Sequence, residues 1–128
     1  NKLKNINVKS SQPYSDFMKK VRLQLSQYFN GNRKSFELNT SFKLTKFHSR
    51  SLREVSKIPY AKTKSYKEIA KIIKSPKAYR AVANANAINP IPIIIPCHRV
   101  INSNGAIGGY AGGSSLKKKL LKFEKDNS

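Results

Sequence analysis

The sequence of 128 residues contains one cysteine, one methionine, two histidines and no tryptophan. A single cysteine excludes an internal disulfide, so the fold does not depend on an oxidising compartment. Cys97, His48 and His98 are the only soft metal ligands, and their spacing fits no zinc motif. No apolar run approaches the roughly 18–20 residues of a membrane span, and no secretory signal opens the chain. We therefore expect an intracellular protein without a metal, a cofactor or a membrane partner.

Acidic residues are also scarce, with 6 Asp and Glu against 26 Lys and Arg and a formal net charge of +20. Such an excess predicts a polyanionic partner, because each neutralised phosphate releases condensed counterions. DNA, RNA and an anionic membrane surface all satisfy this argument. An AT-rich coding bias toward Lys, Asn and Ile is a second explanation, compatible with the first. The charge therefore predicts an anionic partner but does not distinguish among DNA, RNA and a membrane surface.

The apolar pattern divides the chain into a small N-terminal portion, 1–44, and a larger domain, 45–128. A helix is predicted from Ser15-Asp16 to the turn at 30–32, with a short strand at 36–38 and a polar junction at 39–46. The apolar stripe of this helix consists of Phe17, Val21, Leu25 and Tyr28. A second helix is predicted from about Phe47 to Lys57, before Pro59.

Two further helices joined by a tight turn are predicted over residues 65–87. Ser65 and Glu68 form a capping box at the start of the first, and Ser75-Pro76 is predicted to start the second. The second helix would bury Ala78, Ala81, Val82 and Ala85 and expose Arg80, Asn84 and Ala87. This is a helix-turn-helix pattern, and its small residues would let the backbone approach a duplex. Helix pairs of this kind also occur in proteins that never bind DNA, and most arginines of so basic a chain are solvated.

Residues 89–113 combine prolines, a cysteine and glycines. The prolines around 91–95 favour a short buried extended segment that ends at Cys97. A turn at 102–105 and a glycine-rich loop at 108–113 around Tyr110 follow, and Ser114-Ser115 is predicted to cap a final helix to about Lys125.

Cys97 is followed directly by a histidine. A lone cysteine is usually an inert buried thiol, but a nucleophilic thiol needs a base, and His98 is the candidate, acting through a water. A histidine base is commonly oriented by a carboxylate. Glu124 shares a face of the last helix with Lys117, Leu120 and Leu121, so it needs a partner there. A surface lysine and His98 are the two alternatives.

These residues resemble the O6-alkylguanine-DNA alkyltransferases, also called methylated-DNA–protein-cysteine methyltransferases. The resemblance is carried by Asn89-Pro90-x-Pro92-x-x-x-Pro96-Cys97-His98-Arg99-Val100. It extends in order through Thr45-x-Phe47, Ile58-Pro59-Tyr60, Ser65-Tyr66-x-x-Ile69-Ala70, Pro76-x-Ala78-x-Arg80-Ala81-Val82 and Gly109-Tyr110-x-Gly112-Gly113. It covers about residues 45–128, whereas the N-terminal third agrees only loosely.

The resemblance implies an α+β fold with a shortened N-terminal α/β portion and a mainly helical domain that holds a winged helix-turn-helix. It implies a monomer whose partner is double-stranded DNA containing O6-alkylguanine, bound through the minor groove. The alkylated base would be flipped from the stack and its alkyl group transferred irreversibly to Cys97, once per molecule.

The resemblance also implies residue roles. His98 would act as base and Glu124 would orient it, while Asn89 would brace the turn. Tyr66 would donate toward the base ring nitrogen with help from Lys117. Arg80 would occupy the vacated space, and the other DNA-binding residues would be Lys77, Ala78, Asn84 and Arg99. The pocket would include Val100, Tyr110, Ala111 and Gly112, although aromatics such as Tyr66 and Tyr110 more often serve packing.

Two departures from the family pattern stand out. Ala61-Lys62 replaces a common Gly-Glu in a turn, and Ala111 replaces a frequent serine while keeping its N–H. Three rival functions remain: a lesion sensor of the same fold, a plain winged-helix DNA-binding protein, and a membrane-surface peptide. Sensors of this kind lack the cysteine, and the other two leave the Cys-His-Arg-Val run unexplained.

Overall fold

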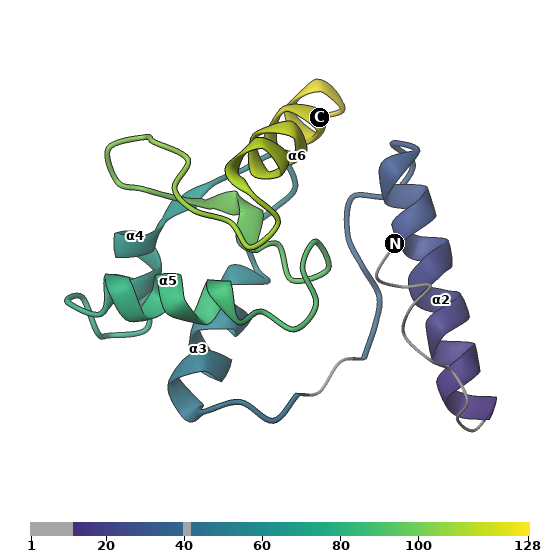
Figure 1. Cartoon of the computed structure of the whole chain (residues 1–128), viewed down its shortest axis with the longest axis horizontal. Coiled ribbons are helices and arrows are strands. Elements are labelled where there is room, and N and C mark those ends of the chain that lie inside the picture. Colours follow the sequence, from purple (N-terminus) through teal and green to yellow (C-terminus); the bar gives the residue numbers. More distant parts are fainter. Residues whose placement is uncertain (1–11, 40–41) are drawn as a thin grey trace. The chain divides into compact units, whose positions relative to one another are not determined.

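The computed structural model describes residues 12–39 and 42–128 and divides the chain into two compact units between residues 41 and 42 (Figure 1). The polar junction predicted at 39–46 includes residues 40 and 41, which lie outside the described residues. No helix in the described ranges combines the length and the apolar character that crossing a bilayer requires. The two units are described separately.

The N-terminal unit is built on helix α2, Gln12–Phe29, which begins three residues before the predicted start. Residues 36–38 do not form the predicted strand, and residues 12–39 contain no strand at all. The side chain of Gln24 instead holds this segment: its Oε1 accepts from Glu37 N–H at 2.9 Å, and its Nε2 donates to Glu37 O at 3.1 Å. The amide of Gln24 thus supplies the backbone hydrogen bonds of Glu37 that a neighbouring strand would otherwise supply.

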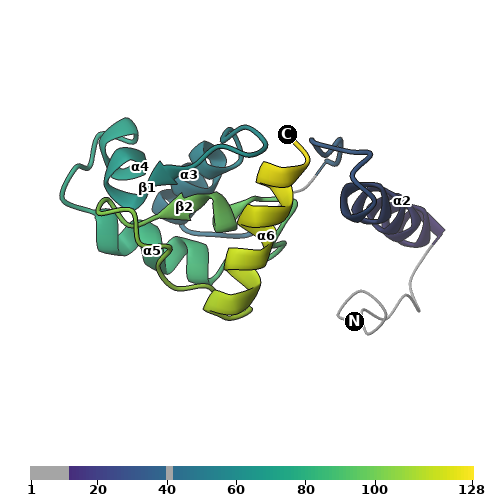
Figure 2. The ribbon, with the colours of Figure 1, turned by 90° about the horizontal axis from the view of Figure 1, so that it is seen from above.

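The C-terminal unit combines helices with one small sheet, which makes the fold α+β. Its α-helices are α3 (Lys46–Val55), α4 (Tyr66–Ile72), α5 (Tyr79–Ala87) and α6 (Ser114–Asp126). Strand β1 (Lys64–Ser65) pairs in parallel with β2 (Val100–Ile101), and the 3₁₀ helix η1 (Cys97–Arg99) leads directly into β2. Figures 1 and 2 show the sheet between α6 and the helices α3 to α5.

The core of this unit joins residues from five elements and two turns. It consists of Val55, Ile58, Ile69, Ala70, Ile73, Val82, Cys97 and Val100. The buried apolar residues of α3 and α4 therefore pack against each other and against η1. Because Cys97 belongs to this cluster, its thiol is held by core packing rather than by a mobile loop.

The capping box that the sequence predicts is confirmed. Ser65 Oγ accepts from Glu68 N–H at 3.0 Å, and the Glu68 carboxylate accepts from Ser65 N–H at 2.9 Å. The predicted exposure of α5 is confirmed for Arg80, Asn84 and Ala87. Val82 and Ala85 are buried as predicted, whereas Ala78 and Ala81 are only half-buried.

The predicted start of α5 at Ser75-Pro76 is wrong, because the helix begins at Tyr79. Helix α4 ends in a Schellman motif: Lys74 has a left-handed φ of 62°, and Ser75 N–H bonds Ala70 O at 2.9 Å. Ala78 N–H then bonds Ser75 O at 2.8 Å. Residues 75–78 form a turn, and Pro76 lies within it rather than in the first turn of a helix.

Two other predictions for the C-terminal unit also fail. Residues 91–95 are a half-buried turn rather than a buried extended segment, since Ile95 N–H bonds Ile91 O at 3.0 Å and Ile93 has a φ of 75°. Helix α6 does run to the predicted region. Ser114 and Ser115, however, lie inside its first turn, and Gly113 occupies the N-cap without a side-chain hydrogen bond.

Candidate active site

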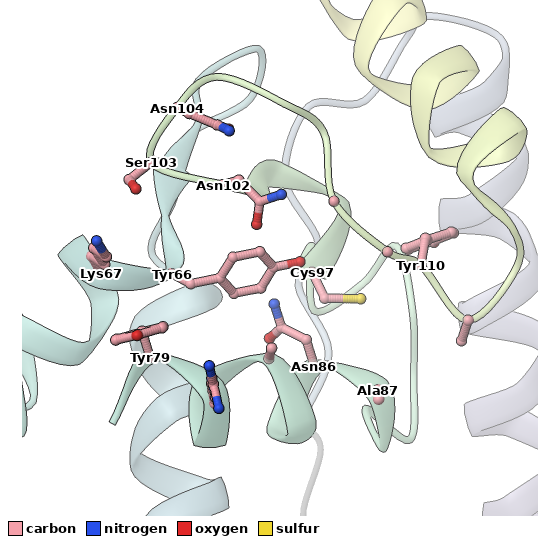
Figure 3. Close-up of a pocket in the computed structure, with 15 residues that line it drawn as sticks. Tyr66, Lys67, Tyr79, Asn86, Ala87, Cys97, Asn102, Ser103, Asn104 and Tyr110 are labelled. Atoms are coloured by element: carbon pink, nitrogen blue, oxygen red, sulfur yellow. The ribbon is translucent and has the colours of Figure 1, made fainter. Parts of the chain in front are cut away.

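A pocket of about 660 Å³ opens beside Cys97 (Figure 3). Its walls come from the start of α4, from α5, from η1 and from the loop 102–111. Figure 3 shows the side chains of Tyr66, Asn86, Cys97 and Tyr110 converging on this space. The capping box at Ser65 places Tyr66 here, because it fixes where α4 begins. The pocket therefore brings together residues that are up to 45 positions apart in the sequence.

Asn89 holds the turn that leads into Cys97. Its Nδ2 donates to Ile95 O at 2.8 Å, and its Oδ1 accepts from Ile91 N–H at 3.0 Å. Both bonds are local to residues 89–95, and they support the left-handed Ile93 conformation between them. The resemblance implied a bracing role for Asn89, and the contacts suit such a role.

Cys97 is 4% exposed, and burial raises the pKa of its thiol above the ordinary value. A hydrogen bond from Asn89 and the positive charge of Lys117 act in the opposite direction and lower this pKa. Burial is the largest of these effects, so the resting thiol holds its proton at neutral pH. Attack on an alkyl carbon therefore requires a base.

His98 and Glu124 form a fully buried pair, with Nε2 of His98 2.7 Å from Oε2 of Glu124. A neutral imidazole that donates from Nε2 keeps its lone pair on Nδ1. Within the described part of the chain, Nδ1 of His98 is buried and has no hydrogen-bond partner. The geometry leaves this nitrogen available to take a proton. Of the two partners considered for Glu124, a surface lysine and His98, the structure shows His98.

Arg99 does not face solvent, contrary to its place among the predicted DNA-binding residues. It is 5% exposed, its Nε and Nη2 donate to the Glu124 carboxylate at 2.8 and 2.9 Å, and its Nη1 donates to Ile58 O at 2.8 Å. A guanidinium held inside by a carboxylate cannot reach a phosphate without leaving that charge unpaired. The sequence pattern did not reveal this burial, because the partners Glu124 and Ile58 lie 25 and 41 residues away along the chain.

Lys117 is fully buried and reaches the site from α6. Its Nζ donates to Val100 O at 2.6 Å, to Gly109 O at 3.2 Å and to Tyr66 Oη at 3.3 Å. Burial lowers the pKa of this ammonium to about 8, while the neighbouring Cys97 acts to raise it. Lys117 thus links the glycine-rich loop, β2 and Tyr66 through a single cation.

Burial also raises the pKa of Tyr66 and of Tyr110, the latter to about 12. Each phenol is therefore protonated at neutral pH and able to donate. Gly108, at φ 75°, passes so close to Tyr66 that a Cβ would lie 3.2 Å from the phenol oxygen. A Cβ on Gly112 would lie 2.8 Å from Leu116, so both glycines permit the close passage of the loop.

The remaining predicted DNA-binding residues lie along the turn before α5 and on α5 itself. Arg80 is exposed and lines the pocket, while Lys77 and Asn84 are exposed outside it and Ala78 is half-buried. Of the predicted pocket residues, Tyr110 and Ala111 line the cavity, whereas Val100 is fully buried and Gly112 borders the loop.

Asn86 lines the pocket and was missed by the sequence analysis. It is 8% exposed, and within the described residues neither amide atom has a hydrogen-bond partner. The signal was present in the helical spacing, because Val82, Ala85 and Asn86 occupy positions i, i+3 and i+4 of one buried face. This spacing places a polar side chain on a buried face, and that is the signal by which the sequence points to Asn86.

Comparison with known proteins gives one family. The family model described as 6-O-methylguanine DNA methyltransferase, DNA binding domain, matches residues 46–126. A methylated-DNA–protein-cysteine methyltransferase of Methanosarcina mazei is 47% identical over 112 residues, covering 88% of this chain and 71% of the relative. The constitutive enzyme of that name from Bacillus subtilis is 45% identical over 106 residues, covering 82% and 64%.

Solved structures agree with this relationship. The Mycobacterium tuberculosis OGT in complex with DNA superposes with a TM-score of 0.84 at 42% identity, covering 87% of this chain and 68% of that one. The S. pombe Atl1 in complex with damaged DNA containing O6-carboxymethylguanine gives a TM-score of 0.56 at 33% identity, covering 65% and 79%.

Proposed function

This chain belongs to the 6-O-methylguanine DNA methyltransferase family, and from that premise we propose that it repairs DNA by moving an alkyl group from O6 of guanine to its own Cys97. The observation that carries the proposal is the placement of Cys97 on a pocket wall, directly before the buried His98–Glu124 pair and within the electrostatic influence of the Lys117 ammonium. A structural thiol in a core requires neither a pocket beside it nor a buried histidine after it.

The substrate is double-stranded DNA that contains O6-alkylguanine. The net charge of +20 favours any polyanion, and helices α4 and α5 with their intervening turn supply the shape that selects a duplex. In this proposal the two helices and the β2-to-loop segment form a winged helix-turn-helix. The exposed face of α5, with Arg80 and Asn84, lies in the minor groove, and Lys77 contacts the backbone.

The pocket receives the alkylated base after it is flipped out of the stack. A base inside a duplex cannot reach Cys97, which is 4% exposed at the inner wall of the pocket. Arg80 stands at the pocket and fills the space that the base leaves. As the family resemblance implies, the carbonyls of Cys97 and Val100 accept from the exocyclic amino group, the latter in addition to its bond from Lys117 Nζ, and Ala111 N–H faces O6. Tyr110 forms part of the remaining wall, and Gly112 lets the loop pass close to the Tyr110 ring.

The transfer exchanges one bond for another. Nδ1 of His98 takes the Cys97 proton through a water, and Glu124 stabilises the resulting imidazolium. The thiolate electron pair forms the S–C bond while the C–O6 bond breaks, and its electrons pass into the purine. Tyr66 transfers its phenol proton to the purine ring nitrogen, and the phenolate that remains is stabilised by the Lys117 ammonium, whose Nζ lies 3.3 Å from its oxygen. Guanine leaves as a neutral base. Because the thioether on Cys97 is stable, each protein molecule reacts only once.

The experiment is intact-mass spectrometry after incubation with an oligonucleotide duplex that carries one O6-methylguanine. We expect one added methyl group per chain, located on Cys97 and absent from Cys97→Ser. Tight binding without a mass change would contradict the transfer and leave a lesion sensor. Equal affinity for damaged and undamaged duplexes, again without a mass change, would leave a general DNA-binding protein.

A further inference from the structure

The side chain of Asn86 is an exception among the buried amides of the described residues. Gln24, Asn86 and Asn89 are 3%, 8% and 9% exposed. Gln24 and Asn89 each use both amide atoms in hydrogen bonds to the backbone. Asn86 uses neither, although each atom is shielded from solvent. An amide that is buried without a partner lowers the stability of a fold, so its presence calls for a second role.

The position of Asn86 indicates where a partner would come from. It lies on α5 and lines the same pocket as Tyr66 and Cys97. Figure 3 shows its amide extending from the helix to a place beneath the phenol of Tyr66, with Cys97 beside it. A molecule that occupies the pocket would therefore meet this amide on the side opposite the loop 102–111. The amide borders the space that a ligand would fill, and its two polar atoms are covered in the free protein, so an entering ligand must shift the side chains that cover them.

The chemistry of the amide restricts the class of ligand. A side-chain amide offers donors and an acceptor without a charge, and in a buried site this suits a neutral, planar partner that carries both kinds of group. A purine base has that pattern, whereas a phosphate or a free carboxylate would be served by the lysines outside. The Ala83 and Ala87 neighbours on α5 leave room for a flat ring above the helix.

We propose that Asn86 is a specificity-determining residue that hydrogen-bonds the extruded alkylated base through its side-chain amide, an inference that rests on the proposed function. Its unpaired atoms are then satisfied only when the base is in the pocket. Normal stacked DNA gains nothing from this contact, because its bases do not enter. The contact thus adds to the affinity for a flipped base and to the rate of transfer, and it lowers the stability of the free protein.

The first test compares Asn86→Leu, which is of similar size and apolar, with wild type. We expect single-turnover transfer from an O6-methylguanine duplex to slow about ten-fold, and the urea midpoint of the free protein to rise. A residue with a purely structural role would give the opposite pair of results, a lower midpoint and an unchanged transfer rate at saturating DNA. Either an unchanged rate or a lower midpoint with a proportionate loss of folded protein overturns the proposal.

A matched control is Ser51→Ala. Ser51 is fully buried on α3, its Oγ has no partner in the described part of the chain, and it does not line the pocket. This variant is expected to keep the wild-type rate of transfer. Asn86→Ala is a second pocket variant that introduces no bulk. If it also transfers at the wild-type rate, the contact does not exist.

A binding measurement separates this proposal from the proposed function. In a Cys97→Ser background, the affinity for an O6-methylguanine duplex is divided by that for the same duplex with guanine. We expect Asn86→Leu to lower this ratio about ten-fold and Ser51→Ala to leave it unchanged. Should wild type bind the lesion but transfer nothing, the proposed function fails, yet a lowered ratio would still support the role of Asn86. An unchanged ratio in an active protein overturns the Asn86 contact alone.

Discussion

Arg99 and Glu124 form a buried ion pair in which Nε and Nη2 of the guanidinium donate to separate oxygens of the carboxylate, at 2.8 and 2.9 Å. The same carboxylate accepts from His98 at 2.7 Å and from Ala61 N–H at 3.1 Å. One acidic side chain of α6 thus holds the proposed base, an interior cation and the turn after Ile58. In the proposed mechanism, alkyl transfer and folding both depend on this carboxylate.

Glu124→Gln should therefore lower both the stability of the fold and the rate of alkyl transfer. The variant keeps the shape but leaves the Arg99 charge buried without a counterion, so we expect the free energy of unfolding to fall by about 3 kcal/mol. Transfer should slow as well, because the imidazolium of His98 loses its stabilising charge. Urea unfolding and single-turnover transfer on the folded fraction measure the two effects.

Asp126→Asn is the matched control, since Asp126 pairs with Lys122 on the same helix at 2.7 Å but in solvent. Its loss should cost less than about 1 kcal/mol and leave transfer unchanged. A Glu124→Gln variant as mild as this control would show that the Glu124 carboxylate controls neither stability nor transfer.

Ala61→Gly should stabilise the protein. Ala61 has a φ of 63°, in the left-handed region that disfavours a Cβ, at the position where the family commonly has glycine. Relief of this strain exceeds the extra chain entropy of glycine, so a gain of about 0.5–1 kcal/mol is expected. Its N–H bond to Glu124 is kept. Thermal unfolding at neutral pH measures the gain.

Lys74→Gly offers an independent comparison, because Lys74 has a φ of 62° at the end of α4 and lies far from the Glu124 network in sequence. A similar gain there and at Ala61 would assign both effects to backbone strain. A loss at Ala61 alone would mean that its methyl group makes a contact worth more than the strain.

The buried Lys117 should give the stability a pH dependence of defined sign. The folded protein releases the Lys117 proton near pH 8, whereas the unfolded chain holds it to about pH 10.5. Between these values the folded state binds fewer protons, so the contribution of Lys117 to the free energy of unfolding rises with pH. Relative to Lys117→Met, wild type should gain about 2 kcal/mol between pH 7 and pH 10.

Cys97 contributes the opposite slope above pH 9, because its pKa is raised in the folded state. The comparison is therefore made in a Cys97→Ser background by urea unfolding at several pH values. A stability difference that stays flat from pH 7 to pH 10 would show that Lys117 retains an ordinary pKa in the fold.

Arg80→Ala should slow transfer from duplex DNA more than transfer from a short single strand. If Arg80 fills the space of the flipped base, its removal should slow transfer from a duplex about ten-fold or more. Transfer from a short single strand needs no such replacement and should change much less. The ratio of the two rates is the measurement. Lys122→Ala on α6 is the control, and it should lower affinity weakly and equally for both substrates.

Much of the framework could be predicted from the sequence because it rests on interactions between near neighbours. The capping box at Ser65 and Glu68 spans three residues, and the apolar spacing of α3, α4 and α6 follows from a helical repeat. The run from Cys97 to Val100 was informative for the same reason. Local pattern nevertheless failed at residues 36–38, where an amide twelve residues or more away replaced the expected strand partner.

The sequence by itself determined which chemical groups are present and where most helices lie, since both follow from residue identity and short-range bonds. Only the tertiary structure decided which groups meet. Glu124 lies 25 residues from Arg99 and 63 from Ala61, and no periodicity links them. The burial of Arg99 and the lack of a partner for the Asn86 amide both depend on how α5, η1 and α6 pack in three dimensions. Packing gives the Arg99 guanidinium its partners and leaves the Asn86 amide without one, because the available partners are set by distance in space and not along the chain.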